Sequence, residues 1–247
     1  WEGNGMGIFE ALRGRGEEAE SMPGTAGLAS DPADEVTDAE LRDRAADYVL
    51  PGFLDREEAT VALRDYFELA DDDPRPGQVI DQLWAARLAE QETWTERSDY
   101  QRLESAFDRL GSEGVLTRMN FTCCQNCGTT EIDDERTPAP AADYPWREWA
   151  YAFFHQQDAE RLAEGPTVLM LSFSAFRPAA DLDPELLAAA AAGDDGARRK
   201  VASETDRRVG ELVVGAFRDA GLKVDWNGDP RTRIAVRIED WRKPLEV

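Results

Sequence analysis

The chain has 247 residues, of which 42% are hydrophobic and 32% charged. This is the composition of a globular protein that is long enough for one large domain or two smaller ones. Its 28 basic and 51 acidic residues give a formal net charge of -23, which argues against DNA, RNA and anionic membranes as partners. No apolar run approaches the ~20 residues of a membrane span, and no signal-peptide pattern is present. We therefore expect a cytoplasmic, acidic protein.

The first 36 residues are predicted to be a flexible segment. They are rich in Gly, Glu, Ala, Ser and Pro, a composition that buries little apolar surface. Residues 1–5 precede Met6 and are predicted to be a cloning remnant. A small apolar patch at Ile8, Phe9 and Leu12 favours one or two turns of helix.

Residues 37–112 are predicted to form a helical region. Thr37 with Glu40, and Asp55 with Glu58, have the spacing of capping boxes that begin two helices. Apolar residues at helical spacing predict two more helices, over about 78–92 and 99–110. Gly111 supplies the stop for the last of them.

Residues 113–247 are predicted to form an α+β domain. Val115, Thr117, Met119, Phe121 and Cys123 alternate like one face of a strand. Further predicted elements are a buried strand over 149–155, a short helix over about 157–163, a strand over 167–176, helices from Asp183 and over 198–220, and a final hairpin over 222–238. The fold class is therefore α+β, a helical N-terminal region followed by a mixed β-sheet covered by helices.

The chemistry-bearing residues are concentrated in two short stretches. All three cysteines, Cys123, Cys124 and Cys127, lie in one, and the only histidine, His155, lies in the other. Cys124 and Cys127 have the spacing that lets two thiolates reach one ion from a turn, which Gly128 would close at positive φ. With Cys123 and His155 they predict a Cys3His zinc site. Adjacent cysteines in a strand point apart, so Asp158 is an alternative to Cys123.

Two other interpretations of the cysteines stay open. Reduced thiols also pack as small hydrophobic groups, and a Cys-x-x-Cys motif also serves thiol redox chemistry. Redox motifs of this type open a helix, whereas Gly128 and the threonines after it indicate a turn. The sequence therefore favours redox chemistry least.

The histidine stretch contains the candidate catalytic residues. His155, Asp158 and Glu160 lie at a predicted strand-to-helix junction, where polar groups are available for acid-base chemistry or polar ligands. The structural interpretation is that a backbone carbonyl satisfies His155, while the two acids cap the helix and compensate its dipole.

The sequence also resembles a known family. The stretches NFTCCQNCGTTEI, YAFFHQQDAERLAEG and VGELVVGAFRDAGLKVDWNGDPRTRIAV resemble an uncharacterised family of actinobacterial proteins, a domain of unknown function, over roughly residues 94–245. The resemblance implies that these residues belong to one domain and assigns no activity, cofactor or catalytic residue.

Three functions are compatible with these features. The leading interpretation is a soluble intracellular binding or regulatory module, stabilised by zinc, because no complete catalytic signature is present. The second is a metal-dependent hydrolase in which Cys124, Cys127 and His155 hold the ion and Asp158 or Glu160 is the general base. The third is a thiol redox or sensor protein. The partner is a small molecule or a protein, and the sequence assigns no oligomeric state.

Overall fold

The computed structural model describes residues 36–140 and 144–246. These residues form eight α-helices, two 3-10 helices and five strands. The predicted flexible segment and cloning remnant, with Ile8, Phe9 and Leu12, lie outside the described residues. No helix within the described ranges is both long and apolar enough to cross a membrane.

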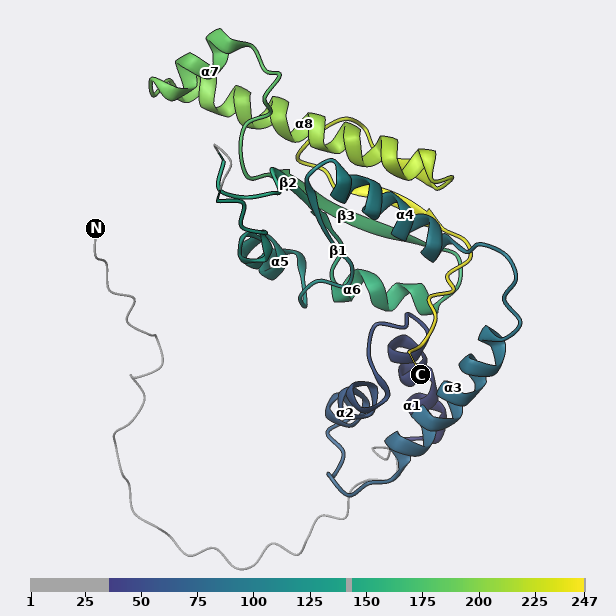
Figure 1. The fold of residues 1–247 in the computed structure, drawn as a ribbon. Coiled ribbons are helices and arrows are strands. Elements are labelled where there is room, and N and C mark those ends of the chain that lie inside the picture. Colours follow the sequence, from purple (N-terminus) through teal and green to yellow (C-terminus); the bar gives the residue numbers. More distant parts are fainter. Residues whose placement is uncertain (1–35, 141–143, 247) are drawn as a thin grey trace, which may run out of the picture. The chain divides into compact units, whose positions relative to one another are not determined.

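Three helices follow one another at the start of the described chain and share a small core (Figure 1). They are α1 (Asp38–Val49), α2 (Arg56–Tyr66) and α3 (Arg75–Gln91). Both predicted capping boxes are confirmed, because Thr37 and Asp55 each exchange hydrogen bonds with the glutamate three residues later. The predicted third helix is also present, beginning three residues earlier than expected with Pro76 in its first turn.

A mixed five-stranded sheet with the order β1-β2-β3-β5-β4 lies at the centre of the remaining chain. Its strands are β1 (Val115–Arg118), β2 (Ala150–Phe153), β3 (Thr167–Ala175), β4 (Lys223–Asp225) and β5 (Ile234–Ile238). Strands β1 and β2 are parallel neighbours, and every other pair is antiparallel. The long β3 pairs with β5 through its first half and with β2 through its second. The predicted α+β class with a mixed sheet is confirmed.

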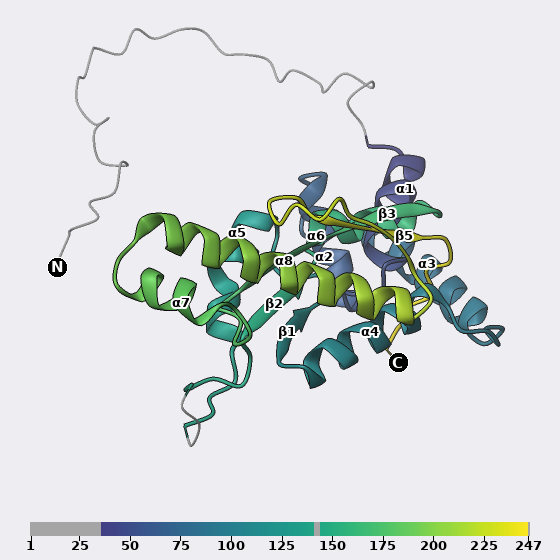
Figure 2. The same ribbon diagram turned by 90° about the horizontal axis from the view of Figure 1, so that it is seen from above.

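Helices cover the sheet on both faces. On one face, α4 (Asp99–Ser112) and α8 (Asp195–Asp219) lie side by side (Figures 1 and 2), with Phe107 and Phe217 in edge-to-face contact between them. On the other face, Leu116, Tyr151 and Phe153 form a second cluster with Ile132. That residue begins the 3-10 helix η1 (Ile132–Glu135), which continues from α5 (Gln125–Glu131). Strands buried on both faces need apolar side chains at consecutive positions, as in β2.

The remaining helices are short or lie at the edge. They are α6 (Gln156–Ala159), η2 (Glu160–Ala163) and α7 (Pro184–Ala191). Helix α7 packs against the start of α8, and Figure 2 shows the two helices joined by a tight connection.

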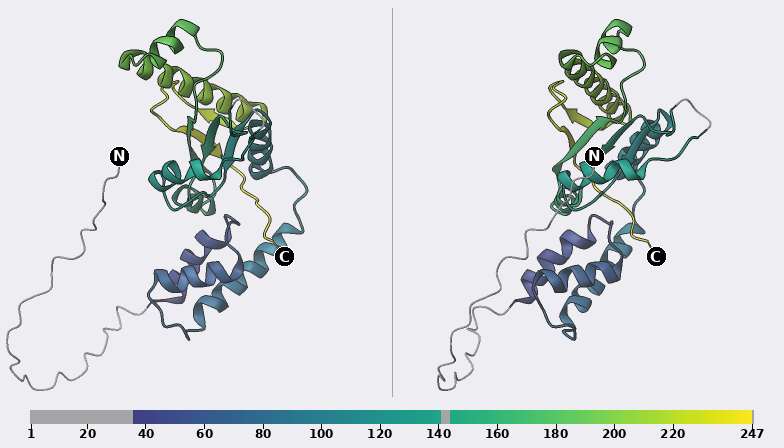
Figure 3. Two further views of the ribbon diagram at one scale, coloured as in Figure 1. Left: turned by 60° about the vertical axis from the view of Figure 1, so that its left-hand side comes forward. Right: turned by 90° about the vertical axis from the view of Figure 1, so that its left-hand side faces the viewer.

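The C-terminal segment after β5 returns to the first three helices (Figure 3). The Trp241 indole N–H donates to the carbonyl of Pro51, and the Arg87 side chain donates to the carbonyl of Trp241. Leu245 is buried in the core of α1–α3. Residues 37–112 and 113–247 thus share contacts, and α4 contributes its apolar side to the core of the sheet.

Two local predictions were wrong. The predicted strand into the cysteines ends at Arg118, and Val115 and Leu116 are both buried, so its residues do not alternate between core and solvent. The predicted turn over Cys124 to Gly128 is the first turn of α5. Gly128 is needed there for space rather than for positive φ, because an added Cβ would lie 2.5 Å from the Phe153 ring.

Candidate functional site

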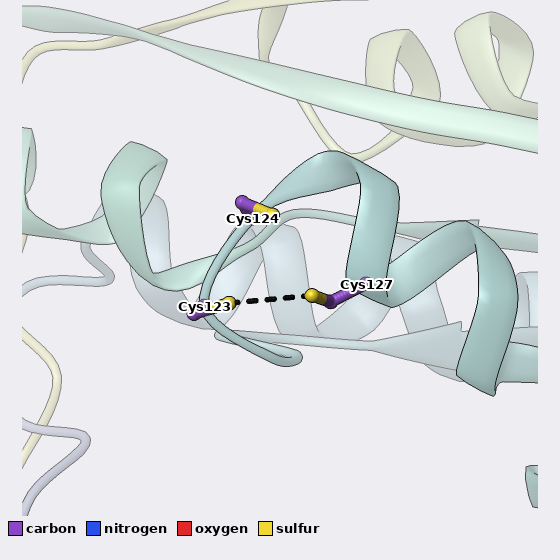
Figure 4. Close-up of side chains that lie close together, drawn as sticks. All are labelled: Cys123, Cys124 and Cys127. Atoms are coloured by element: carbon purple, nitrogen blue, oxygen red, sulfur yellow. Dashed lines mark hydrogen bonds between the residues drawn. The ribbon is translucent and has the colours of Figure 1, made fainter. Parts of the chain in front are cut away.

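The three cysteines form one cluster at the start of α5. Their sulfur atoms all lie within 4.8 Å of one another, and they are the one His/Cys/Asp/Glu group of three or more with metal-binding spacing in residues 36–140 and 144–246. In Figure 4, the sulfur atoms of Cys123 and Cys127 face each other beside the first turn of the helix. Cys123 Sγ donates to Cys127 Sγ over 3.5 Å. Thiolates around a tetrahedral zinc ion lie about 3.8 Å apart, so the cluster needs only small side-chain movements to hold one.

All three thiols are accessible. Cys123 is exposed, while Cys124 and Cys127 are partly buried, and all three are free thiols. The alternative that they pack as small hydrophobic groups in the core is therefore not supported by their positions. A reagent or an ion can reach the cluster from solvent.

The helix gives the cysteines unequal acidity. Cys124 occupies the N-cap of α5, and Cys127 lies in the first turn. The backbone N–H of Cys127 lowers the pKa of Cys124, and the side chains of Cys127 and Cys123 lower it further. The neighbouring Cys123 and Cys124 side chains raise the pKa of Cys127 to about 12. Cys124 therefore ionises at a lower pH than Cys127.

The segment leading into the cluster is held in an unusual backbone conformation. Asn120 and Thr122 both have positive φ, 52° and 56°. Asn tolerates this region, but a β-branched residue such as Thr rarely adopts it. Strain of this kind persists only where surrounding contacts fix the chain, and it is concentrated at functional sites.

Those fixing contacts come from the histidine stretch. Phe121 N–H donates to the carbonyl of Phe154 over 2.8 Å, and Gln156 N–H donates to the carbonyl of Thr122 over 3.0 Å. The two stretches singled out in the sequence therefore lie side by side, as the parallel pairing of β1 and β2 requires.

The side chain of His155, in contrast, belongs to a separate polar group. Its Nε2 lies 3.0 Å from Asp158 Oδ2, and both side chains are buried. Arg233, which precedes β5, donates to both carboxylate oxygens of Asp158 and to the carbonyl of Met170. Burial lowers the pKa of His155, Asp158 raises it and Arg233 lowers it again. A neutral imidazole that donates from Nε2 leaves Nδ1 as an acceptor, and this buried atom has no partner among the described residues.

The remaining predicted site residue lies elsewhere. Glu160 is partly exposed and pairs with Arg44 of α1 at 3.3 Å. Both acids assigned to the hydrolase hypothesis are therefore already paired, and neither belongs to the cysteine group. Sequence reasoning missed Arg233, which is 75 residues from Asp158 in the chain, and no local pattern marks that pairing. The φ of Thr122 is likewise not visible in the sequence.

The chain belongs to a family described as a domain of unknown function (DUF6891), whose model matches residues 34–245. The resemblance found in the sequence is confirmed at the level of a family without an assigned function. Comparison with curated proteins and with solved structures gave no match.

Proposed function

We propose that this protein is a binding or regulatory module of a reducing intracellular compartment, with a three-thiol site that binds zinc. The observation that carries the proposal is the convergence of the sulfur atoms of Cys123, Cys124 and Cys127 within 4.8 Å. Thiolates prefer soft or borderline metal ions. Zinc is such an ion, and it does not change its oxidation state. The abundance of arginine and alanine supports an actinobacterial source for the chain.

The cluster supplies three ligands, and zinc takes four. A fourth ligand from solvent or from a bound molecule makes this an open site rather than a closed structural one. An open position on an accessible ion suits reversible binding of a thiol, an imidazole or another donor. The alternative fourth ligand is His155, which must then leave Asp158.

Metal content tests this proposal directly. Protein purified with a reducing agent and without chelator should contain one zinc per chain by mass spectrometry. Cobalt substitution should give the intense near-ultraviolet absorption of thiolate-to-metal charge transfer. Cys123→Ser, Cys124→Ser and Cys127→Ser should each lose this absorption, while Asn126→Ala, between the last two ligands, is the matched control and should keep it.

Two outcomes would contradict the proposal. One is failure of the reduced protein to take up added zinc or cobalt. The other is full metal content in all three serine variants. His155→Gln separates the two sources of the fourth ligand, since loss of metal in that variant would place the imidazole on the ion.

The placement of Cys124 favours thiol redox chemistry as a second candidate function. Contrary to the sequence-based expectation, the Cys-x-x-Cys motif does open a helix, with an acidic thiol at its N-cap and a less acidic one in its first turn. In such a pair the first thiolate attacks a substrate disulfide, and a second cysteine releases the substrate as two thiols. The protein loses two hydrogen atoms as its own disulfide forms.

Intact mass spectrometry tests the redox candidate. Metal-free protein incubated with a small disulfide should become lighter by two hydrogen atoms, and two of its three thiols should no longer react with an alkylating reagent. The Cys124→Ser variant should show neither change. A stable mixed disulfide on Cys124 with no internal disulfide would count against this candidate.

A further inference from the structure

Two neighbouring cavities meet at the same two residues, and the smaller one also borders α5 at Gln125 and Thr129. The larger, about 460 Å³, lies between the end of β3, α7 and α8. Its apolar wall consists of Phe176, Leu187, Ala190, Ala191, Val201 and Ala202. The smaller, about 230 Å³, has a polar wall that includes Tyr151, Ser172 and Arg233. Ser174 and Asp206 line both cavities.

Asp206 is a half-buried carboxylate without a cation. Its Oδ1 accepts hydrogen bonds from Ser174 Oγ at 2.8 Å and from the N–H of Ala175 at 3.2 Å. No lysine, arginine or histidine of the described chain lies within 4.0 Å of it, and none of its described neighbours donates to Oδ2. Burial raises the pKa of Asp206, and the two hydrogen bonds lower it. The effect of burial is the larger, so the pKa lies above its usual value. A partly desolvated carboxylate in this position is stabilised by a positive charge from outside the chain.

The arginines around the cavities already have partners, although the buried Nε of Arg233 has none among the described residues. Arg198 pairs with Asp195 at 3.6 Å and donates to the carbonyl of Ala190. In the smaller cavity, Arg231 and Arg233 pair with Asp229 and Asp158. The guanidinium of Arg177 lies over the ring of Tyr144, 4.3 Å from its centre. An anionic ligand would have to displace these contacts, whereas a cationic ligand meets Asp206 directly.

A second hydrogen-bond acceptor lies in the smaller, polar cavity. Ser172 is 5% exposed and lines the smaller cavity, and its Oγ has no partner among the described residues. Ser172 and Ser174 are two positions apart in β3, so they lie on the same side of the strand. A buried hydroxyl without a partner is unfavourable, and a donor on a bound molecule would satisfy it.

We propose that these cavities bind an apolar small molecule that carries a protonated amine. The ammonium group pairs with Asp206 and donates toward Ser172, while the apolar body lies along α7 and α8 in the larger cavity. An ammonium group has three N–H donors, which suits two acceptors, Asp206 where the cavities meet and Ser172 in the smaller cavity. No cysteine lines either cavity, although the smaller one borders the cysteine helix at Gln125 and Thr129.

A matched series of probes tests the head group. 3-Phenylpropylamine, 3-phenylpropan-1-ol and 3-phenylpropanoate share one body and differ in charge, and their affinities are measurable by ligand-observed NMR titration. The amine should bind at least ~10-fold more tightly than the alcohol, because only it forms a charge-assisted hydrogen bond. Asp206→Asn should remove this preference. Its side-chain oxygen still accepts from Ser174 and Ala175, so the fold is retained.

Two further variants complete the test. Glu211→Gln removes an exposed carboxylate of the same helix, which pairs with Arg207, and should leave amine binding unchanged. Ala202→Phe fills the larger cavity from an exposed position of α8 and should weaken binding of the amine and the alcohol alike. Equal affinity for amine and alcohol, preference for the carboxylate, unchanged amine affinity in Asp206→Asn, or no binding of any probe at millimolar concentration would each overturn the proposal.

Discussion

Gly128 of α5 lies directly against the ring of Phe153 in β2, where an added Cβ would be 2.5 Å from Cε2 and 2.7 Å from Cζ. Phe153 is fully buried, so its ring has no room to withdraw. This contact determines how closely the helix that carries Cys124 and Cys127 approaches the sheet. The position of the cysteine cluster relative to the sheet thus depends on Gly128, although this residue is not part of the cluster.

Gly128→Ala is accordingly expected to destabilise the protein by ~1–3 kcal/mol, the usual cost of overpacking a core. The measurement is the free energy of unfolding from a urea titration. Gly215→Ala in α8 is the matched control, because a Cβ at that helical position meets nothing within 4 Å. It should stabilise the protein by up to ~1 kcal/mol, the difference in helix propensity. Equal effects of the two changes would show that the contact with Phe153 is not restrictive.

Metal removal should leave the domain folded. All three ligands of the proposed site come from five consecutive residues, so an ion there connects no distant parts of the chain. This differs from zinc domains whose folding depends on the ion because its ligands converge only in the folded state. We expect a chelator to shift the melting temperature by only a few degrees, with the change in hydrogen exchange confined to residues 120–131. Global unfolding on chelation would instead indicate a closed structural site.

Alkylation should distinguish Cys124 from Cys127 in metal-free protein. Because the pKa of Cys124 is lowered and that of Cys127 is raised to about 12, iodoacetamide at neutral pH should label Cys124 before Cys127. Peptide mass spectrometry over a time course gives the order. If Cys127 reacted as fast as Cys124, the hydrogen bonds at the start of α5 would not control thiol acidity.

The sequence predicts some parts of this molecule well, for identifiable reasons. The capping boxes at Thr37 and Asp55 are local, since each is complete within four residues, and both are confirmed. The consecutive apolar residues of β2 and β3 also predict buried strands without knowledge of their partners. The family resemblance over the cysteine and histidine stretches is confirmed as membership of one family.

The cysteine segment shows why other parts were not predictable. The motif of Cys124 and Cys127 followed by a glycine is compatible with a turn or with a helix. The reason for the glycine lies in Phe153, which is 25 residues further along the chain and leaves no space for a Cβ at the contact. The same reason applies to His155, whose partner Asp158 is local but whose second neighbour Arg233 is not. The serines at 172 and 174, within an otherwise apolar strand, were the available signal for the polar cavity.

His155 should make stability depend on pH in a narrow range. Burial lowers its pKa in the folded state below the ordinary value of 6.5. As the pH falls through about 6.5, the unfolded chain therefore binds a proton that the folded chain does not, and the free energy of unfolding decreases. The slope is limited to ~1.4 kcal/mol per pH unit for one proton. Since the sequence contains a single histidine, His155→Gln should flatten urea unfolding data between about pH 5.5 and 6.5. An unchanged slope would exclude this assignment.

Leu245 should contribute more to stability than its place near the C-terminus suggests. It is 3% exposed and packs in the core of α1–α3. Leu245→Ala should cost ~2–4 kcal/mol, as for other large-to-small changes in a core. Val61→Ala, at a position of α2 that is 42% exposed, should cost less than ~0.5 kcal/mol. A loss below 1 kcal/mol in Leu245→Ala, on the order of an exposed-site change, would mean that the segment is not held in this core.

The return of the C-terminal segment also has a consequence for how the protein is made. The side chain of Gln91, at the end of α3, accepts a hydrogen bond from the N–H of Leu245 at 2.9 Å, and these residues are 154 positions apart. During translation, α1–α3 leave the ribosome long before their last core residue has been synthesised. Helices α1–α3 therefore stay incompletely packed and accessible to chaperones until the segment after β5 has been synthesised. Only then can Leu245 complete their core.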